Sequence, residues 1–147
     1  MFGVVNAQWT QVNNGLPTTN KIYGIAFSGT NIFAGTDDGL FLSTNFGNSW
    51  NIVNNGLPSN NPVYAITVSD TNIFLGTYNG VYVSTNNGNN WSCKGLAGYI
   101  VSVIAISEKY IFVNTYEGVY RSTNNGNSWT PAHYELPSDG WANAFAF

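Results

Sequence analysis

A repeat of about forty residues constrains this chain more than any other feature. The repeat is marked by tryptophans spaced 41, 41 and 38 residues apart, at Trp9, Trp50, Trp91 and Trp129. The last three of these each close an almost identical eight-residue segment, at residues 43–50, 84–91 and 122–129. Self-similarity at this period is typical of architectures in which each repeat contributes one supersecondary unit.

Two further echoes keep the same period. A short Thr- and Gly-containing segment recurs at residues 35–39, 76–80 and 114–118. The sequence Asn-Asn-Gly-Leu-Pro at residues 13–17 returns at residues 54–58. Agreement at three places within each unit indicates a structural repeat and not a chance match.

Each unit divides into four short apolar segments separated by turn residues. In the first unit we expect strands at residues 22–27, 31–36, 40–43 and 50–53. The tip Asp37-Asp38-Gly39 predicts a hairpin with a primed turn, because glycine tolerates a positive φ. Four strands in about forty residues is the size of one propeller blade. The expected fold is therefore all-β: β-propeller blades of four antiparallel strands, about three of them complete.

The strand count also predicts an orphan strand at each end. Residues 9–12 correspond to an outermost strand, and residues 141–147 align with the innermost strand at residues 62–68. Pro131 falls in the last outermost strand, where a proline fits because an edge residue needs no ladder donor. We assign residues 9–147 to the repeats. Residues 1–8 form an extension, either a signal-peptide remnant ending at Ala7 or a plain N-terminal strand.

The segment Ser-Thr-Asn-x-Gly-x-x-Trp resembles the Asp-box, or bacterial neuraminidase repeat, with asparagine where that family has aspartate. Such repeats occur in sialidases, sortilin-type receptors, xyloglucanases and photosystem II assembly-factor propellers. The resemblance covers nearly the whole chain and implies a β-propeller. The residues matched to the motif are Ser43, Asn45, Gly47, Trp50, Ser84, Asn86, Gly88, Trp91, Ser122, Asn124, Gly126 and Trp129.

In the family this box is a folding element on the face away from the usual active site. The residue types suit that role. The serine hydroxyl and the asparagine amide can satisfy backbone groups of the turn, and asparagine also tolerates the left-handed region. Glycine takes the positive φ, and tryptophan packs between blades.

Candidates for catalysis are few. The sialidase chemistry implied by the resemblance needs several arginines for a carboxylate clamp, and Arg121 is the only arginine. A glycosidase needs two carboxyl groups across the scissile bond. The candidates are Asp37 and Asp38 on one tip, Glu117 on another, and Asp70 and Glu108 at the opposite end of two blades. We expect the chain to have no enzymatic activity and to bind no cofactor. His133 is the only histidine, so we expect no metal site.

Composition limits the partners. Four basic and seven acidic residues make 7% of the chain charged, against about 25% in an ordinary domain. The cations Lys21, Lys94, Lys109 and Arg121 are scattered, which argues against nucleic acid. Low charge favours association.

Cys93 is expected as a small buried hydrophobe within a strand, with a reactive thiol as the alternative. No apolar run is long enough for a transmembrane segment.

The hairpin tips are the candidate ligand-binding positions, because they vary between units while the glycines behind them repeat. They are Asp37, Asp38, Tyr78, Asn79, Tyr116 and Glu117. Tyrosine beside a carboxylate or amide offers a ring face and directed hydrogen bonds to a glycan or peptide. The alternative is that these tyrosines only stabilise the hairpins.

Three functional hypotheses follow. The first is a secreted or cell-surface, non-catalytic module that binds a glycan or a protein. The second is a structural subunit that forms a homo-oligomer, as a ring or a filament, by strand exchange between copies. A rival explanation for the orphan strands is that the chain is a fragment of a longer gene product. The third hypothesis, ranked last, is a carbohydrate-active hydrolase.

Overall fold

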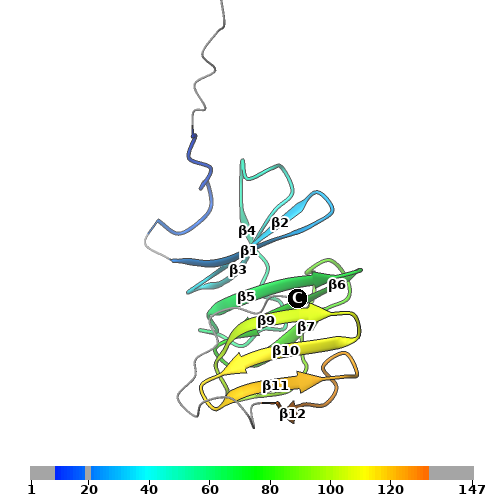
Figure 1. The fold of residues 1–147 in the computed structure, drawn as a ribbon. Helices are drawn as coiled ribbons and strands as arrows, with labels where there is room; N and C mark the ends of the chain where they lie inside the picture. Colours follow the sequence, from blue (N-terminus) through cyan, green and yellow to red (C-terminus); the bar gives the residue numbers. More distant parts are fainter. Residues whose placement is uncertain (1–8, 19–20, 133–147) are drawn as a thin grey trace, which may run out of the picture.

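The computed structural model describes residues 9–18 and 21–132, which form three four-stranded antiparallel sheets (Figure 1). Blade 1 consists of β1 (Ile22–Ser28), β2 (Asn31–Thr36), β3 (Gly39–Ser43) and β4 (Asn51–Ile52). Blade 2 consists of β5 (Val63–Ser69), β6 (Asn72–Thr77), β7 (Gly80–Ser84) and β8 (Ser92–Cys93). Blade 3 consists of β9 (Val101–Ser107), β10 (Tyr110–Thr115), β11 (Gly118–Ser122) and β12 (Thr130–Pro131). The expected blades are confirmed.

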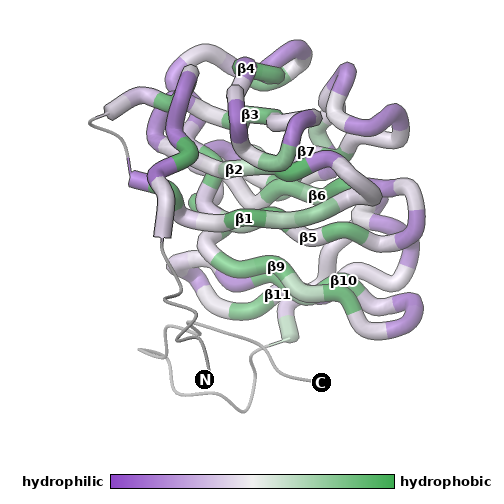
Figure 2. The backbone as a smooth tube through the Cα atoms, turned by 90° about the horizontal axis from the view of Figure 1, so that it is seen from above, coloured by the Kyte–Doolittle hydropathy of each residue, from purple (hydrophilic) through white to green (hydrophobic). Residues whose placement is uncertain are grey.

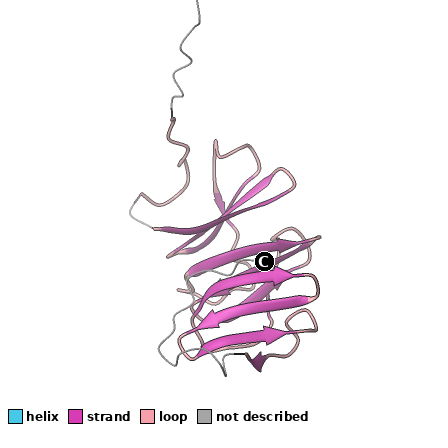
Figure 3. Cartoon of the chain, in the orientation of Figure 1, coloured by secondary structure: helices cyan, strands magenta, loops and turns pink. Residues whose placement is uncertain are grey.

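Each sheet is a simple meander in which every strand pairs with the next one along the chain. The registers repeat from blade to blade: Phe33 pairs with Leu42 as Phe74 pairs with Val83. The described part of the chain is all strand and loop, as Figure 3 shows, so it contains no helix that could cross a membrane. Pro131 lies in β12, an edge strand, where its missing N–H costs no ladder bond.

The blades pack face to face, and the cores lie between them. One core joins Phe33 and Leu40 of blade 1 to Ile73, Leu75 and other apolar residues of blade 2. The next core joins the opposite face of blade 2 to blade 3 in the same way. Hydrophobic stretches therefore run along the strands while the connecting loops are hydrophilic (Figure 2).

The box turns, residues 43–50, 84–91 and 122–129, are hydrogen-bonded as the residue types predict. Ser43 Oγ accepts from the Gly47 N–H at 2.8 Å, and Asn45 Oδ1 accepts from the Ser49 N–H at 2.9 Å. The same bonds recur in the other two turns. Gly47 has a positive φ of 86°, whereas Asn45, although asparagine tolerates the left-handed region, does not adopt it. That conformation falls on the following residue, which is Phe46 in blade 1, with φ 58°.

The hairpin tips also depart from one expectation. Positive φ occurs at Gly39, the residue after the two-residue tip, and at neither Asp37 nor Asp38. A primed turn would need a positive φ within the tip. The geometry instead fits an ordinary turn followed by a glycine bulge.

Two further expectations are wrong. Cys93 is exposed, because β8 is a two-residue edge strand with no sheet outside it. Residues 9–12 form no strand, since the described structure gives them no neighbour with which to pair. Val12 nevertheless serves as an outermost strand would, because its carbonyl accepts the indole N–H of Trp50 at 2.9 Å. The expected strand at residues 141–147 and the extension at residues 1–8 lie outside the described residues.

Candidate functional site

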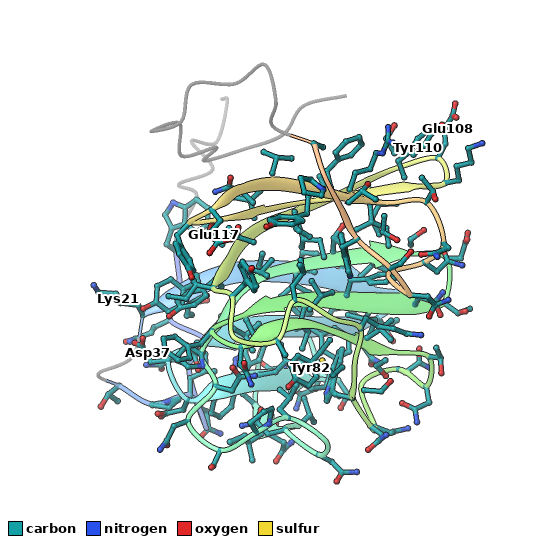
Figure 4. The ribbon with its side chains drawn as sticks, turned by 90° about the horizontal axis from the view of Figure 1, so that it is seen from below. Lys21, Asp37, Tyr82, Glu108, Tyr110 and Glu117 are labelled. Atoms are coloured by element: carbon teal, nitrogen blue, oxygen red, sulfur yellow. The ribbon has the colours of Figure 1, made fainter. Side chains whose placement is uncertain are left out.

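The three hairpin tips between the second and third strands of each blade lie on one side of the molecule, called here the tip face. Asp37 and Glu117, from the tips of blades 1 and 3, lie on this side in Figure 4, together with Lys21. Glu108 and Tyr110 lie on the opposite side. The tip face is thus distinct from the ends of the blades where the first and second strands are joined.

A threonine holds each tip in place. Thr36 Oγ1 accepts from the Asp38 N–H at 3.1 Å and donates to the Gly39 carbonyl at 3.1 Å. Thr77 and Thr115 make the same pair of bonds. Sequence analysis missed this role, although the threonine recurs in all three units. Because the backbone of each tip is fixed from within, the tip side chains are presented on a rigid base.

A first cluster, the Asp37 cluster, consists of Asp37, Tyr23 and Tyr64. The Tyr23 hydroxyl donates to Asp37 Oδ1 at 2.6 Å, and the Lys21 N–H donates to Oδ2 at 3.2 Å. The Tyr23 and Tyr64 rings meet edge to face at a centroid distance of 5.0 Å. The hydrogen bond to Asp37 raises the pKa of Tyr23 to about 12 and lowers the pKa of Asp37. Asp37 therefore stays ionised at neutral pH.

A second cluster, the Glu117 cluster, consists of Tyr99, Tyr116, Glu117 and Tyr120. The Tyr99 ring stacks on Tyr116 at 5.9 Å with an interplanar angle of 23°, and it meets Tyr120 edge to face at 5.9 Å. The Tyr120 hydroxyl donates to Glu117 Oε2 at 3.5 Å. Hydrogen bonding to Glu117 raises the pKa of Tyr99 to about 12. The negative charge of Glu117 is also the main cause that raises the pKa of Tyr116.

The remaining predicted tip residues have different surroundings. Asn79 Oδ1 accepts from the Gly98 N–H at 2.6 Å, so its amide oxygen ties the tip of blade 2 to the loop before β9. The Asn79 N–H donates to Asn61 Oδ1, and the Nδ2 of this buried Asn61 has no partner among the described residues. Tyr78 is exposed. Asp38 is exposed at the outer end of its tip.

The structure brings Tyr23, Tyr64, Tyr99 and Tyr120 to the predicted tip residues. None of these four tyrosines lies in a tip, so sequence analysis missed them. Tyr23 and Tyr64 occupy the same position of the innermost strand in blades 1 and 2, one residue after its start. That repetition, next to a strand end on the tip side, is the signal that could have identified them.

The opposite side of the molecule holds the other acidic residues. Asp70 and Glu108 line one pocket of about 260 Å³ with Lys109 and Asn125, between the equivalent turns of blades 2 and 3. They lie apart from the carboxylates of the tip face. Among residues 9–18 and 21–132, no three His, Cys, Asp or Glu side chains are grouped so that they could hold a metal ion.

All four cations were expected to be scattered, but two of them lie close together. The Lys109 ammonium lies 5.4 Å from the centroid of the Tyr110 ring, and the Arg121 guanidinium lies 5.6 Å from it. Tyr110 brings them together because β10 and β11 are adjacent strands of blade 3. Two cations on one ring are far fewer than the clusters that neutralise a phosphate backbone.

The stacked four-stranded sheets and the shared tip face define the class: these are blades of a β-propeller. Residues 40–145 match the DUF6242 beta propeller domain, and the chain belongs to this family. No curated protein matches the chain.

Three solved structures share the fold. An ancestral GH74 enzyme is 24% identical over 84% of this chain and 19% of its own, with a TM-score of 0.66. YCF48 from Cyanidioschyzon merolae is 21% identical over 84% of this chain and 40% of its own, with a TM-score of 0.66. The extracellular domain of BT4673 from B. thetaiotaomicron is 15% identical over 83% of this chain and 18% of its own, with a TM-score of 0.69. The chain spans less than half the length of each, and the likeness concerns the fold.

Proposed function

We propose that this chain is a non-catalytic propeller module that binds a glycan or a protein through its tip face. The observation that carries the proposal is the pairing of tyrosine rings with a carboxylate at two separate tips. Tyr116, at one of these tips, is 56% exposed, and Tyr78, at the tip of blade 2, is 53% exposed. Exposed aromatic rings beside directed polar groups are the usual composition of a recognition surface.

The chemistry of the clusters supports binding over catalysis. The tyrosine hydroxyls donate to Asp37 and Glu117, and these hydrogen bonds raise the pKa of Tyr23 and of Tyr99 to about 12. A nucleophilic tyrosine would need the opposite shift, because the tyrosinate is the reactive form. Both phenols therefore remain neutral near pH 7 and act as fixed hydrogen-bond donors.

Two finer assignments belong to the same proposal. The recurring bonds of the box turns support their assignment as Asp-box-type repeats that use asparagine. The presence of an extracellular domain among the similar structures supports a secreted or cell-surface location.

The test replaces both exposed tip tyrosines, as Tyr78→Ser with Tyr116→Ser. We expect loss of binding to a panel of glycans and peptides with little change in melting temperature, since both rings are exposed. The matched control is Tyr110→Ser on the opposite side, which should leave binding unchanged. Binding that survives the double substitution would place the site elsewhere.

A second candidate function, self-assembly, is favoured by the outer face of blade 1. Ile25 and Phe27 of β1 are 55% and 65% exposed, whereas the residue of blade 3 equivalent to Ile25, Ile104, is 7% exposed. The other two blades bury this face against the preceding blade. Together with Ile22, these two side chains form an apolar surface of the kind that binds another protein chain.

The outer face of blade 3 is a poor complement to this surface. A Cβ at Gly35 would lie 2.6 Å from the Val63 carbonyl oxygen, and one at Gly76 would lie 2.7 Å from that of Val101. Glycine therefore lets consecutive blades approach closely. Blade 3 has Asn114 at this position, and the change hinders another blade from docking there at the same spacing. We propose that two copies pair through their blade 1 faces, about a twofold axis.

Light scattering tests the pairing at several protein concentrations. We expect a dimer that dissociates when Ile25→Asp and Phe27→Asp are combined. The control is Phe46→Asp, which removes an even more exposed aromatic side chain from a box turn and should leave the dimer intact. If the parent chain is monomeric at every concentration, or if it forms filaments, the proposed pairing through blade 1 is refuted.

A further inference from the structure

We infer that the Glu117 cluster takes the guanidinium group of an arginine, so that the ligand of the tip face is a basic peptide segment. This inference rests on the proposed function and names the ligand of the same face. It is carried by three features of the cluster: its rings, its uncompensated charge, and its contrast with the Asp37 cluster.

Three tyrosine rings pack against one another next to Glu117, and two of them hydrogen-bond its carboxylate. Tyr99 and Tyr116 are nearly parallel, with an interplanar angle of 23°, and Tyr120 stands at 68° to Tyr99. Tyr116 is 56% exposed, so a ring at the outer end of this stack is open to a ligand. A planar cation can continue such a stack, where the negative face of the ring attracts it.

The negative charge of Glu117 has no counter-charge in the described residues. All four Lys and Arg residues of the chain are described, and each has other surroundings. Lys21 lies beside Asp37, and Lys94 Nζ donates to Asn127 Oδ1 at 2.8 Å. Lys109 and Arg121 lie over the Tyr110 ring. A cationic ligand would therefore supply the missing partner of Glu117.

The Asp37 cluster provides an internal comparison. It has the same elements, a carboxylate that accepts from a tyrosine hydroxyl and two tyrosine rings in contact. However, Lys21 is present there: its N–H donates to Asp37, and its positive charge helps to lower the pKa of Asp37. Of the two clusters, only that of Glu117 thus combines open rings with an unbalanced charge.

Arginine suits this arrangement better than lysine. Its planar guanidinium stacks on aromatic rings and can donate two parallel bonds to one carboxylate, whereas an ammonium group acts as a point charge. The Glu117 carboxylate already hydrogen-bonds Tyr99 and lies 3.5 Å from the Tyr120 hydroxyl, and these contacts orient it before the ligand arrives. A neutral sugar could contact the same rings, but it would gain nothing from the charge.

The experiment compares three short peptides that differ at one position. The probes are acetylated, amidated Gly-Gly-X-Gly-Gly peptides with X as arginine, lysine or citrulline, the neutral isostere of arginine. NMR titration of the protein reports both affinity and location. We expect the arginine peptide to bind about tenfold more tightly than the citrulline peptide, with the lysine peptide between them, because cation–π and ion-pair contacts act together.

Variants test the assignment to Glu117. In Glu117→Gln the preference for arginine over citrulline should disappear, whereas Glu108→Gln on the opposite side should preserve it. Equal binding of arginine and citrulline by the parent protein, or a preference that survives Glu117→Gln, would overturn the inference. If citrulline or a neutral oligosaccharide binds equally well through Tyr116, the proposed function stands and only this inference fails. If no probe perturbs the tip face, both fail.

Discussion

The indole N–H of Trp91 donates to the backbone carbonyl of Val53 at 2.9 Å, across the boundary between blades 1 and 2. Trp50 makes the same bond to Val12, and Trp129 makes it to Lys94 at 2.7 Å. Trp91 and Trp129 are thus each joined to the segment that leads out of the preceding blade, and Trp50 is joined to the equivalent segment ahead of blade 1. The repeat spacing of the tryptophans reflects this contact between neighbouring units.

We predict that Trp91→Phe destabilises the chain by about 1–3 kcal/mol. The substitution keeps an aromatic ring in a site where Trp91 is 2% exposed, but it leaves the Val53 carbonyl without its donor. Urea denaturation measures the change in the free energy of unfolding. An unchanged midpoint would show that this bond contributes nothing to the blade contact.

The second prediction concerns the box turn of blade 2. Asn86 Oδ1 accepts from the Ser84 hydroxyl at 2.8 Å and from the Asn90 N–H at 3.0 Å. Asn86→Ala removes this acceptor, and we expect a loss of about 1 kcal/mol or more. Asn86→Asp keeps it and should be nearly neutral. Thermal melts of both variants decide, and an alanine variant as stable as the parent would contradict the structural role of the turn.

The blades could be predicted from sequence because their determinants are local. The recurring Thr- and Gly-containing segment and the box turn each lie within one unit, and they predicted the four strands of each blade in the right order. The exposure of Cys93 could not be found in this way. Its position within a predicted strand suggested a buried side chain, but β8 is a two-residue edge strand that no other described sheet covers.

The candidate site was harder to predict because its members lie apart in the sequence. Tyr116 and Glu117 stand out as tip residues, but Tyr99 comes from the loop that leads into blade 3. Tyr23 is likewise 14 residues from Asp37, whose carboxylate it contacts. These groups meet through the pairing of strands within a blade, and Tyr64 of blade 2 meets Tyr23 of blade 1 through the stacking of the blades, which the linear pattern does not display.

The third prediction concerns alkaline pH. Tyr23 has a pKa of about 12 in the folded chain, against an ordinary value of 10.0. Its interaction with Asp37 therefore contributes stability that is fully present below pH 10 and is lost as the pH rises towards 12. In Asp37→Asn the pKa of Tyr23 should fall towards its ordinary value.

Absorbance of the tyrosinate, followed across this pH range, measures the change. We expect one tyrosine to titrate at lower pH in Asp37→Asn than in the parent. Asp38→Asn is the matched control, since Asp38 makes no such bond to Tyr23, and its titration curve should coincide with that of the parent. Coincident curves for all three proteins would contradict the assignment of the raised pKa to Asp37.

The last prediction concerns the close approach of blades 2 and 3. Gly76 has no positive φ, so its requirement for glycine is one of space: an added Cβ would lie 2.7 Å from the Val101 carbonyl oxygen, which is backbone and cannot turn aside. Gly76→Ala should therefore destabilise by about 1–3 kcal/mol through overpacking. Gly24→Ala is the matched control, because Gly24 also lies in a strand without positive φ and its added Cβ would meet nothing closer than 3.5 Å. We expect that control to stay within about 1 kcal/mol of the parent. Equal urea midpoints for the two variants would show that glycine is not needed for the spacing of the blades, and would remove the reason to treat Asn114 as an obstacle to a further blade.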